Sequence, residues 1–215
     1  ISMFEDGKGN IWFGTQNKGV SVLTKEIKKT KREDIEVAVF KNFSVVDGLI
    51  DNNVFSISED GEGNIWLGTR NGATRLNPST KVIKNFTVDE GLGGNKVYKV
   101  FRDREGNLWF GILGGYLTKY NGEEFKTFNL NQKFILSMDE DIDGNIWFGA
   151  YGGGIIKYNP REKEAGMQFQ NFTVENGLSS NSPLFIKCDD HGNVWIGQSR
   201  GIEKLDAQTQ RFSLY

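Results

Sequence analysis

The chain has 215 residues, of which 25% are charged, and its formal net charge is −2. This near-neutral balance gives no electrostatic basis for binding nucleic acid. No apolar stretch approaches the ~20 residues of a membrane-spanning helix, so we expect no membrane insertion by this segment. His191 is the single histidine, which excludes a multi-histidine metal site. We expect neither a metal nor another cofactor.

One phrase, Gly-Asn-aliphatic-Trp-hydrophobic-Gly, occurs five times along the chain. Its copies lie roughly 40 to 55 residues apart, and periods of this size indicate a solenoid, a propeller or another repeat array. The phrase contains every tryptophan of the chain: Trp12, Trp66, Trp109, Trp147 and Trp195.

The second repeat shows most clearly what one unit is. Its sequence predicts strands over 54–58, 64–69, 73–76 and 82–87, separated by turns rich in Gly, Asp and Asn. Four short strands with three tight turns form an antiparallel meander. No window of the chain predicts a convincing amphipathic helix.

The tryptophan strand indicates how the meanders pack. Side chains alternate between faces, so Ile65 and Leu67 share one face while Trp66 and Gly68 share the other. A strand that is apolar on both faces must be covered on both, and the glycine leaves room for a bulky group from the neighbouring sheet. Sheets stacked face to face around an axis satisfy this requirement.

We therefore predict an all-β fold, a β-propeller of five four-stranded antiparallel blades. The alternative is an open arc of a larger seven- or eight-bladed propeller. We expect one domain over 1–215, with repeats at approximately 1–43, 44–86, 87–128, 129–172 and 173–215.

A connector of the form aromatic-Thr-x-x-x-Gly-Leu-x-x-Asn joins the repeats. It stands at 86–95 and 172–181, with an altered copy at 43–52. Together with the phrase Asp-x-x-Gly-Asn-Ile-Trp-Phe-Gly-Thr, it resembles the two-component regulator propeller repeat of bacterial hybrid sensor kinases. The resemblance implies a periplasmic or extracellular ligand-sensing module. Members often have two propellers before a membrane span and a kinase, and they commonly sense oligosaccharides.

The chain departs from this pattern in several places. The connector between the third and fourth repeats shrinks to 128–132, and the first repeat carries an insertion at 25–34. This insertion holds five Lys or Arg and three acidic residues, which predicts a solvated hairpin, with a partner contact as the second interpretation. The chain begins inside a strand and stops where a connector should begin. We interpret it as a piece of a longer array, with any signalling output elsewhere or absent.

Two patterns have a structural and a functional interpretation. The tryptophans could form a carbohydrate-stacking platform, but their fixed place in an apolar strand favours core packing. The segment 141–145 looks like the first part of a calcium loop. An apolar strand follows it with no further ligand at the needed offset, so a hairpin turn is favoured.

Catalysis has little support in the sequence. Streptogramin lyases are propellers with a similar Gly-Asn-Ile-Trp-Phe-Thr phrase, which makes them the enzyme alternative. Here His191 lies in a predicted turn and no second histidine offers acid–base help, although a carboxylate mechanism stays open. We expect a protein that is not an enzyme.

Ligand contacts are expected where the repeats differ while their frame stays constant. In a propeller, the loops between second and third strands and the connectors between blades emerge on the same face, near the central channel. The former offer Arg70, Tyr151 and Arg200, whose groups suit a sugar or uronate. The connectors offer Asn53, Asn95 and Asn181, which could equally cap turns.

These observations favour a non-enzymatic sensor propeller that binds an oligosaccharide or other small ligand. The second hypothesis is a protein-interaction scaffold without a small ligand, and the third is a lyase or hydrolase of propeller type. Expected partners beyond the ligand are a second copy of the chain or the remainder of a longer sensor chain.

Overall fold

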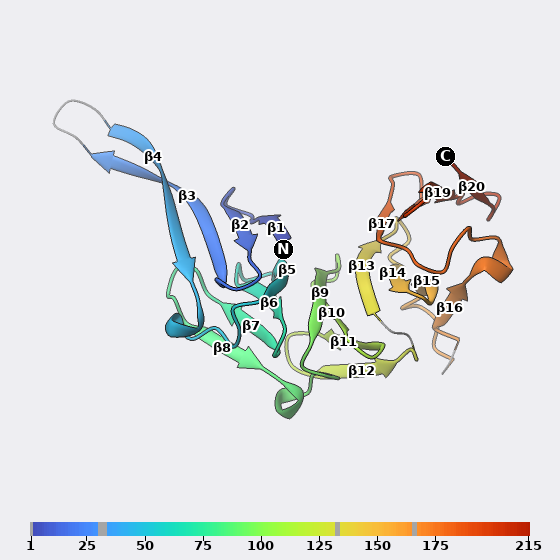
Figure 1. Cartoon of the computed structure of the whole chain (residues 1–215), viewed down its shortest axis with the longest axis horizontal. Helices are drawn as coiled ribbons and strands as arrows, with labels where there is room; N and C mark the ends of the chain where they lie inside the picture. Colours follow the sequence, from blue (N-terminus) through green and yellow to red (C-terminus); the bar gives the residue numbers. More distant parts are fainter. Residues whose placement is uncertain (1, 30–33, 132–133, 165–166) are drawn as a thin grey trace. The chain divides into compact units, whose positions relative to one another are not determined.

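The structure, a computed structural model, describes residues 2–29, 34–131, 134–164 and 167–215. In these residues the strands form five sheets, each a meander of four antiparallel strands. The chain divides into two compact units, residues 1–100 and 101–215, which are drawn in Figure 1. Each unit is considered separately below.

The first unit contains two whole sheets and the beginning of a third. In the second repeat, the strands lie within about one residue of those predicted. The first sheet is formed by β1 (Ser2–Glu5), β2 (Ile11–Gly14), β3 (Val20–Lys29) and β4 (Asp34–Phe43), the second by β5 (Val54–Glu59), β6 (Ile65–Thr69), β7 (Ala73–Leu76) and β8 (Ile83–Phe86), and the third begins with β9 (Val97–Arg102).

The second unit contains the rest of the third sheet and two further sheets. Its strands are β10 (Leu108–Ile112), β11 (Tyr116–Tyr120) and β12 (Phe125–Asn129), then β13 (Phe134–Glu140), β14 (Ile146–Tyr151), β15 (Gly154–Tyr158) and β16 (Phe169–Phe172), then β17 (Phe185–Cys188), β18 (Val194–Gln198), β19 (Gly201–Leu205) and β20 (Phe212–Leu214). The helical segments in the described residues are three short 3-10 turns, η1 (Val45–Asp47), η2 (Val88–Glu90) and η3 (Val174–Asn176). None of them is long and apolar enough to span a bilayer.

The prediction of an all-β fold with five four-stranded antiparallel blades is confirmed. A closed five-bladed ring and an open arc of a larger ring are both compatible with these sheets. The extent of a single domain over 1–215 likewise stays a prediction.

The tryptophan strands of the second and third repeats are the most deeply buried parts of their sheets. Every residue of β6 and of β10 is buried, and Trp66 and Trp109 are fully enclosed. The first and fifth repeats differ from the second and third. Ile11 and Phe13 of β2 are only half-buried, and so is Trp195 of β18.

In the second and third repeats, the glycine two residues after the tryptophan allows close packing between sheets. A Cβ atom on Gly68 would lie 3.0 Å from side-chain carbons of Val97 and Val100. A Cβ atom on Gly111 would lie 2.8 Å from the Met138 methyl group. The absent side chain therefore makes room for the first strand of the following sheet, as the sequence predicts.

An aspartate holds each tryptophan through a hydrogen bond that the sequence analysis does not anticipate. The indole Nε1–H donates to a carboxylate oxygen at 2.8 Å in all five repeats. The same carboxylate accepts from the backbone and side-chain N–H groups of the intervening asparagine. The pairs are Asp6–Trp12, Asp60–Trp66, Asp103–Trp109, Asp141–Trp147 and Asp189–Trp195.

This hydrogen bond also decides the interpretation of 141–145. The Asp141 carboxylate is directed to Asn145 and Trp147, so the segment is a hairpin turn. No cluster of His, Cys, Asp and Glu suited to a metal ion occurs in the described part of the chain.

We expect the last of these aspartates to make stability depend on acid pH. Burial alone would raise the pKa of Asp189, but hydrogen bonds from Trp195, Asn193 and His191 outweigh it and lower the pKa to about 2. A group with a depressed pKa stabilises the fold above its ordinary value of 3.8. That contribution is lost as pH falls from about 4 towards 2.

Urea unfolding at a series of pH values between 6 and about 2 measures this loss. Asp189→Asn should be less stable than the parent at neutral pH and should show a shallower acid decline. An unchanged acid decline in the variant would contradict the assignment.

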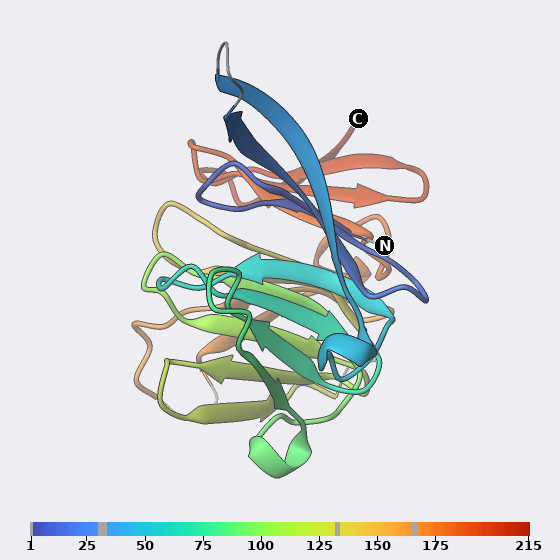
Figure 2. The same ribbon diagram turned by 90° about the vertical axis from the view of Figure 1, so that its left-hand side faces the viewer.

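The insertion predicted at 25–34 lengthens one hairpin of the first sheet. Strands β3 and β4 each have 10 residues, and they extend beyond the other strands of that sheet (Figures 1 and 2). Their backbones pair Lys25 with Ala38 and Lys29 with Asp34. Residues 30–33 of the insertion lie outside the described residues, as does Gln132 of the shortened connector. A partner contact at the insertion stays a prediction.

Candidate functional site

The two ends of each sheet carry different turns. In a four-stranded meander, the turns joining strands one to two and three to four lie at one end, and the turn joining strands two to three lies at the other. The connector that leads into a sheet joins its first strand at this second end. We call it the connector end. Arg70, Tyr151 and Arg200 all lie at or next to a turn between second and third strands, so they belong to the connector end of their sheets.

The connectors are rigidly built. Their 3-10 turns are followed by Gly48, Gly91 and Gly177 at φ values of 109°, 110° and 100°, a conformation that favours glycine. The next residue is a buried leucine in each case: Leu49, Leu92 and Leu178. Each 3-10 turn also has a capping box, in which its third residue accepts a hydrogen bond from the preceding Ser or Thr N–H.

The connector asparagines cap these turns. The Oδ1 atoms of Asn95 and Asn181 each accept a 2.9 Å hydrogen bond from the first N–H group of the 3-10 turn. In the first connector it is Asn52, not Asn53, that occupies the equivalent place, accepting from Val45 at 3.0 Å. The spacing Gly-Leu-x-x-Asn is the signal that could have identified Asn52. The side-chain carbonyls of all three asparagines are thus engaged within the connectors.

In the first unit, Arg70 and Asn53 are brought together. The Arg70 backbone N–H donates to the Asn53 carbonyl at 3.3 Å. Asp51 is buried beside them and accepts from the Asn53 N–H, the Asn53 amide and the Asn71 amide at 2.6, 2.9 and 2.6 Å. The Arg70 side chain is exposed, so a fixed turn presents a solvent-accessible guanidinium.

In the second unit, the fourth sheet and the connector that follows it bring Tyr151 near Asn181. The N–H of Gly154, the first residue of β15, donates to the Asn181 carbonyl at 2.9 Å. Tyr151 is 44% exposed and packs edge-to-face on Phe134 at 6.4 Å between ring centroids. Arg200 is exposed in the turn between β18 and β19.

A shallow hollow of about 390 Å³ lies at the connector end of the first sheet. Its lining combines apolar groups with hydroxyl and amide groups. Gln16 belongs to the turn between β2 and β3, the kind of loop where ligand contacts are expected. The lining residues are Ser2, Met3, Phe13, Gly14, Thr15 and Gln16.

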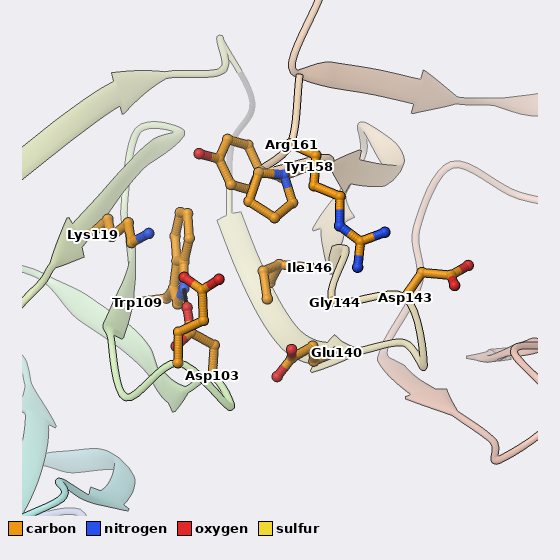
Figure 3. Close-up of a pocket in the computed structure, with 11 residues that line it drawn as sticks. Asp103, Trp109, Lys119, Glu140, Asp143, Gly144, Ile146, Tyr158 and Arg161 are labelled. Atoms are coloured by element: carbon orange, nitrogen blue, oxygen red, sulfur yellow. Dashed lines mark hydrogen bonds between the residues drawn. The ribbon is translucent and has the colours of Figure 1, made fainter. Parts of the chain in front are cut away.

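A second, better enclosed pocket lies in the second unit, at the sheet end opposite the connectors (Figure 3). Its volume is about 110 Å³. The turns β9–β10, β13–β14 and β15–β16 contribute most of its lining. None of the six predicted ligand-binding residues lines it, and the sequence analysis does not single it out. The lining includes Asp103, Glu105, Trp109, Lys119, Glu140, Asp143, Tyr158 and Arg161.

Carboxylates dominate the electrostatics of this pocket. Burial raises the pKa of Glu140, and the charges of Asp103 and Glu105 add to that rise, although the Arg104 N–H and guanidinium oppose it. The Arg104 N–H donates to Glu140 Oε2 at 2.7 Å. Burial likewise raises the pKa of Tyr158, and the charges of Glu105 and Asp103 add to the effect.

Comparison with known families agrees with the repeat pattern. The two component regulator propeller family matches residues 1–17, 48–71, 91–114 and 129–152. These four segments contain the first four tryptophan phrases, and each match spans the Asp–Trp hairpin. Four segments of the chain thus match the two component regulator propeller model.

Solved structures with the same fold include extracellular domains of two-component and one-component systems. The extracellular domain of the hybrid two component system BT3049 from B. thetaiotaomicron is 21% identical, with a TM-score of 0.70 over 96% of this chain and 33% of that chain. The extracellular domain of the one component system BT4673 from the same organism is 22% identical, with a TM-score of 0.72 over 94% of this chain and 26% of that chain. At this identity the likeness shows the fold.

A surface protein of another kind has the same fold. PorZ, a bacterial surface component of the type-IX secretion system of Porphyromonas gingivalis, is 15% identical with a TM-score of 0.64, over 99% of this chain and 33% of that chain. The chain thus spans about a third or less of these three structures. A search of curated protein sequences finds no match.

Proposed function

We propose that this chain is a ligand-sensing part of a bacterial signalling protein, located in the periplasm or outside the cell, and that it has no catalytic activity. The observation that carries the proposal is that the repeats share one hydrogen-bonded scaffold while their loops at the connector end differ in sequence. All five repeats hold the same Asp–Trp hydrogen bond at 2.8 Å, whereas the turns between second and third strands differ in sequence. Variable loops on a rigid scaffold are where binding residues concentrate.

The chemistry of the connector end suits an oligosaccharide, including one with uronate groups. Arg70 and Arg200 offer guanidinium groups for bidentate recognition of a carboxylate. Tyr151 offers an exposed ring for stacking on a sugar, and the hollow beside Gln16 offers apolar surface with a polar rim. The match to the regulator propeller model and the extracellular domains of two-component and one-component systems among the structural neighbours support the same role. Binding would shift the propeller against a partner and so report to a kinase.

Thermal denaturation with a panel of neutral and uronate-containing oligosaccharides tests this proposal. A ligand at about 100 times its Kd should stabilise the fold by about 2.7 kcal/mol. We expect Arg70→Ala to weaken binding of a ligand held by the first unit by roughly tenfold or more, as loss of a charge-assisted contact does. Tyr151→Ala and Arg200→Ala should do the same for a ligand held by the second unit.

Arg211→Ala provides the matched control, because Arg211 is also exposed but lies in the turn between β19 and β20, away from the connector end. Failure of every oligosaccharide to raise Tm would contradict the sugar-sensing proposal. Turnover of any of them would replace it with the lyase or hydrolase alternative.

A further inference from the structure

Neighbouring sheets pack on one another in one repeated way. The side of a sheet that carries the tryptophan, which we call its tryptophan face, packs on the opposite side of the following sheet, which we call the aliphatic face. Within the two units this packing joins Trp12 with Ile65 and Leu67, Trp109 with Ile146 and Phe148, and Trp147 with Val194 and Ile196. Each sheet therefore has two faces that are complementary to the opposite faces of other sheets.

The aliphatic face of the first sheet is exposed. Met3, which pairs opposite Phe13, is 73% exposed, and Phe40 on the same face is exposed as well. In three other sheets the residue at the place of Met3 is only 5–6% exposed: Ile57, Met138 and Ile186. The first sheet thus has the apolar character of a packed face without being covered.

The tryptophan face of the fifth sheet is exposed in the same chain. Trp195 is half-buried, and Ile202, opposite Gly197, is 45% exposed. The residues at the place of Ile202 in the other four sheets are fully buried: Val20, Ala73, Leu117 and Ile155. The exposed Phe185 ring lies over Gly197, where side chains of the following sheet lie in the other repeats. This face is therefore also apolar and uncovered.

A glutamate fastens two of the junctions between sheets. Glu59 accepts a 2.7 Å hydrogen bond from the Gly7 N–H of the preceding sheet, and Glu140 accepts one of the same length from the Arg104 N–H. Glu5 holds the same place in the first sheet, at the end of the first strand and opposite the aliphatic residue before the tryptophan. It is exposed, so the acceptor is in place for the turn of a docking sheet.

The fifth sheet has an opposite charge at the matching place. Between the fourth and fifth sheets, Asp139 beside the tryptophan accepts a 2.7 Å hydrogen bond from the Cys188 N–H. On the two exposed faces these places belong to Lys187 and Glu5, so the same packing would bring an ammonium group to a carboxylate. This attraction offsets the repulsion between Glu5 and Asp190, which lies in the neighbouring turn.

We propose that the aliphatic face of the first sheet docks on the tryptophan face of the fifth sheet of a second copy of this chain. The contact continues the packing found between sheets within the chain, and it joins Glu5 to Lys187 of the second copy. Such a head-to-tail contact leaves a free face on each copy, so association should continue beyond a dimer. Met3 and Phe13 also line the hollow beside Gln16, so a ligand held there would compete with docking.

Two variants that each block one face test this contact by light scattering over a range of protein concentrations. Met3→Glu and Ile202→Glu should each weaken self-association at least about tenfold, because docking would bury an unpaired charge. An equal mixture of the two should form dimers that do not grow, since each copy keeps the face that the other has lost. Val82→Glu is the matched control and should associate like the parent, because Val82 is 63% exposed in the turn between β7 and β8, outside both faces.

Charge reversal tests the pairing of Glu5 with Lys187. Glu5→Lys and Lys187→Glu should each weaken association by roughly three- to tenfold, the size expected for an exposed ion pair turned into a repulsion. Mixing the two variants should restore association, because every contact between them joins opposite charges. Circular dichroism of each variant confirms that it is folded.

A parent protein that stays monomeric as its concentration rises would overturn the proposal. So would a mixture of Met3→Glu and Ile202→Glu that remains monomeric, or an Ile202→Glu variant that associates like the parent. Since no sugar is present in these measurements, their outcome leaves the oligosaccharide proposal to its own test.

Discussion

Replacing Trp109 by alanine is expected to lower the free energy of unfolding by about 3–5 kcal/mol. The side chain is fully buried and packs against Phe148 and Tyr158 at 5.8 and 5.1 Å between ring centroids. Its removal opens a cavity in the core of the second unit. It also deprives Asp103, a buried carboxylate, of its indole donor.

Chemical unfolding monitored by circular dichroism measures this loss. Trp195→Ala is the matched comparison, because Trp195 makes the same hydrogen bond to its aspartate but is only half-buried. Its cost should be clearly smaller. Equal losses in both variants would show that the hydrogen bond, rather than burial, carries the stabilisation.

Gly68→Ala is expected to destabilise the first unit by about 1–3 kcal/mol, although it adds a single methyl group. The new Cβ atom would lie 3.0 Å from the Val97 carbonyl oxygen as well as from two valine side chains. Gly68 is not at a positive φ, so the penalty is one of crowding and not of backbone strain. The carbonyl belongs to a strand of the following sheet and cannot move away without shifting that strand.

A double-mutant cycle with Val100→Ala tests this cause. Val100 contributes one of the two crowded side chains, so removing its methyl groups should recover part of the loss caused by Gly68→Ala. Strictly additive effects of the two substitutions would contradict the crowding explanation.

The binding-site predictions show where inference from the sequence stops. The connector spacing locates Asn95 and Asn181, and the structure shows each as a turn cap; their role with a ligand stays a prediction. Asn53 lies one residue beyond the equivalent position, which Asn52 occupies. Arg70 and Tyr151 are accessible at the expected end of their sheets.

The sequence repeat was sufficient to establish the four-stranded meanders, the apolar tryptophan strand and the space beside its glycine. These features follow from the alternation of side chains along each strand and from the turn residues, and both recur in every repeat. The Asp and Trp of this hydrogen bond are also periodic, lying six residues apart in every repeat. Only the folded hairpin shows that the carboxylate accepts a hydrogen bond from the indole N–H.

The pocket around Tyr158 was decided by the tertiary structure alone. Its carboxylates come from the turn after β9, from the end of β13 and from the turn after β13, and its tyrosine comes from the end of β15. No spacing relates these residues, because they meet only when neighbouring sheets pack face to face. Periodic patterns encode how a chain pairs with itself locally, whereas packing between sheets determines which polar groups end up enclosed together.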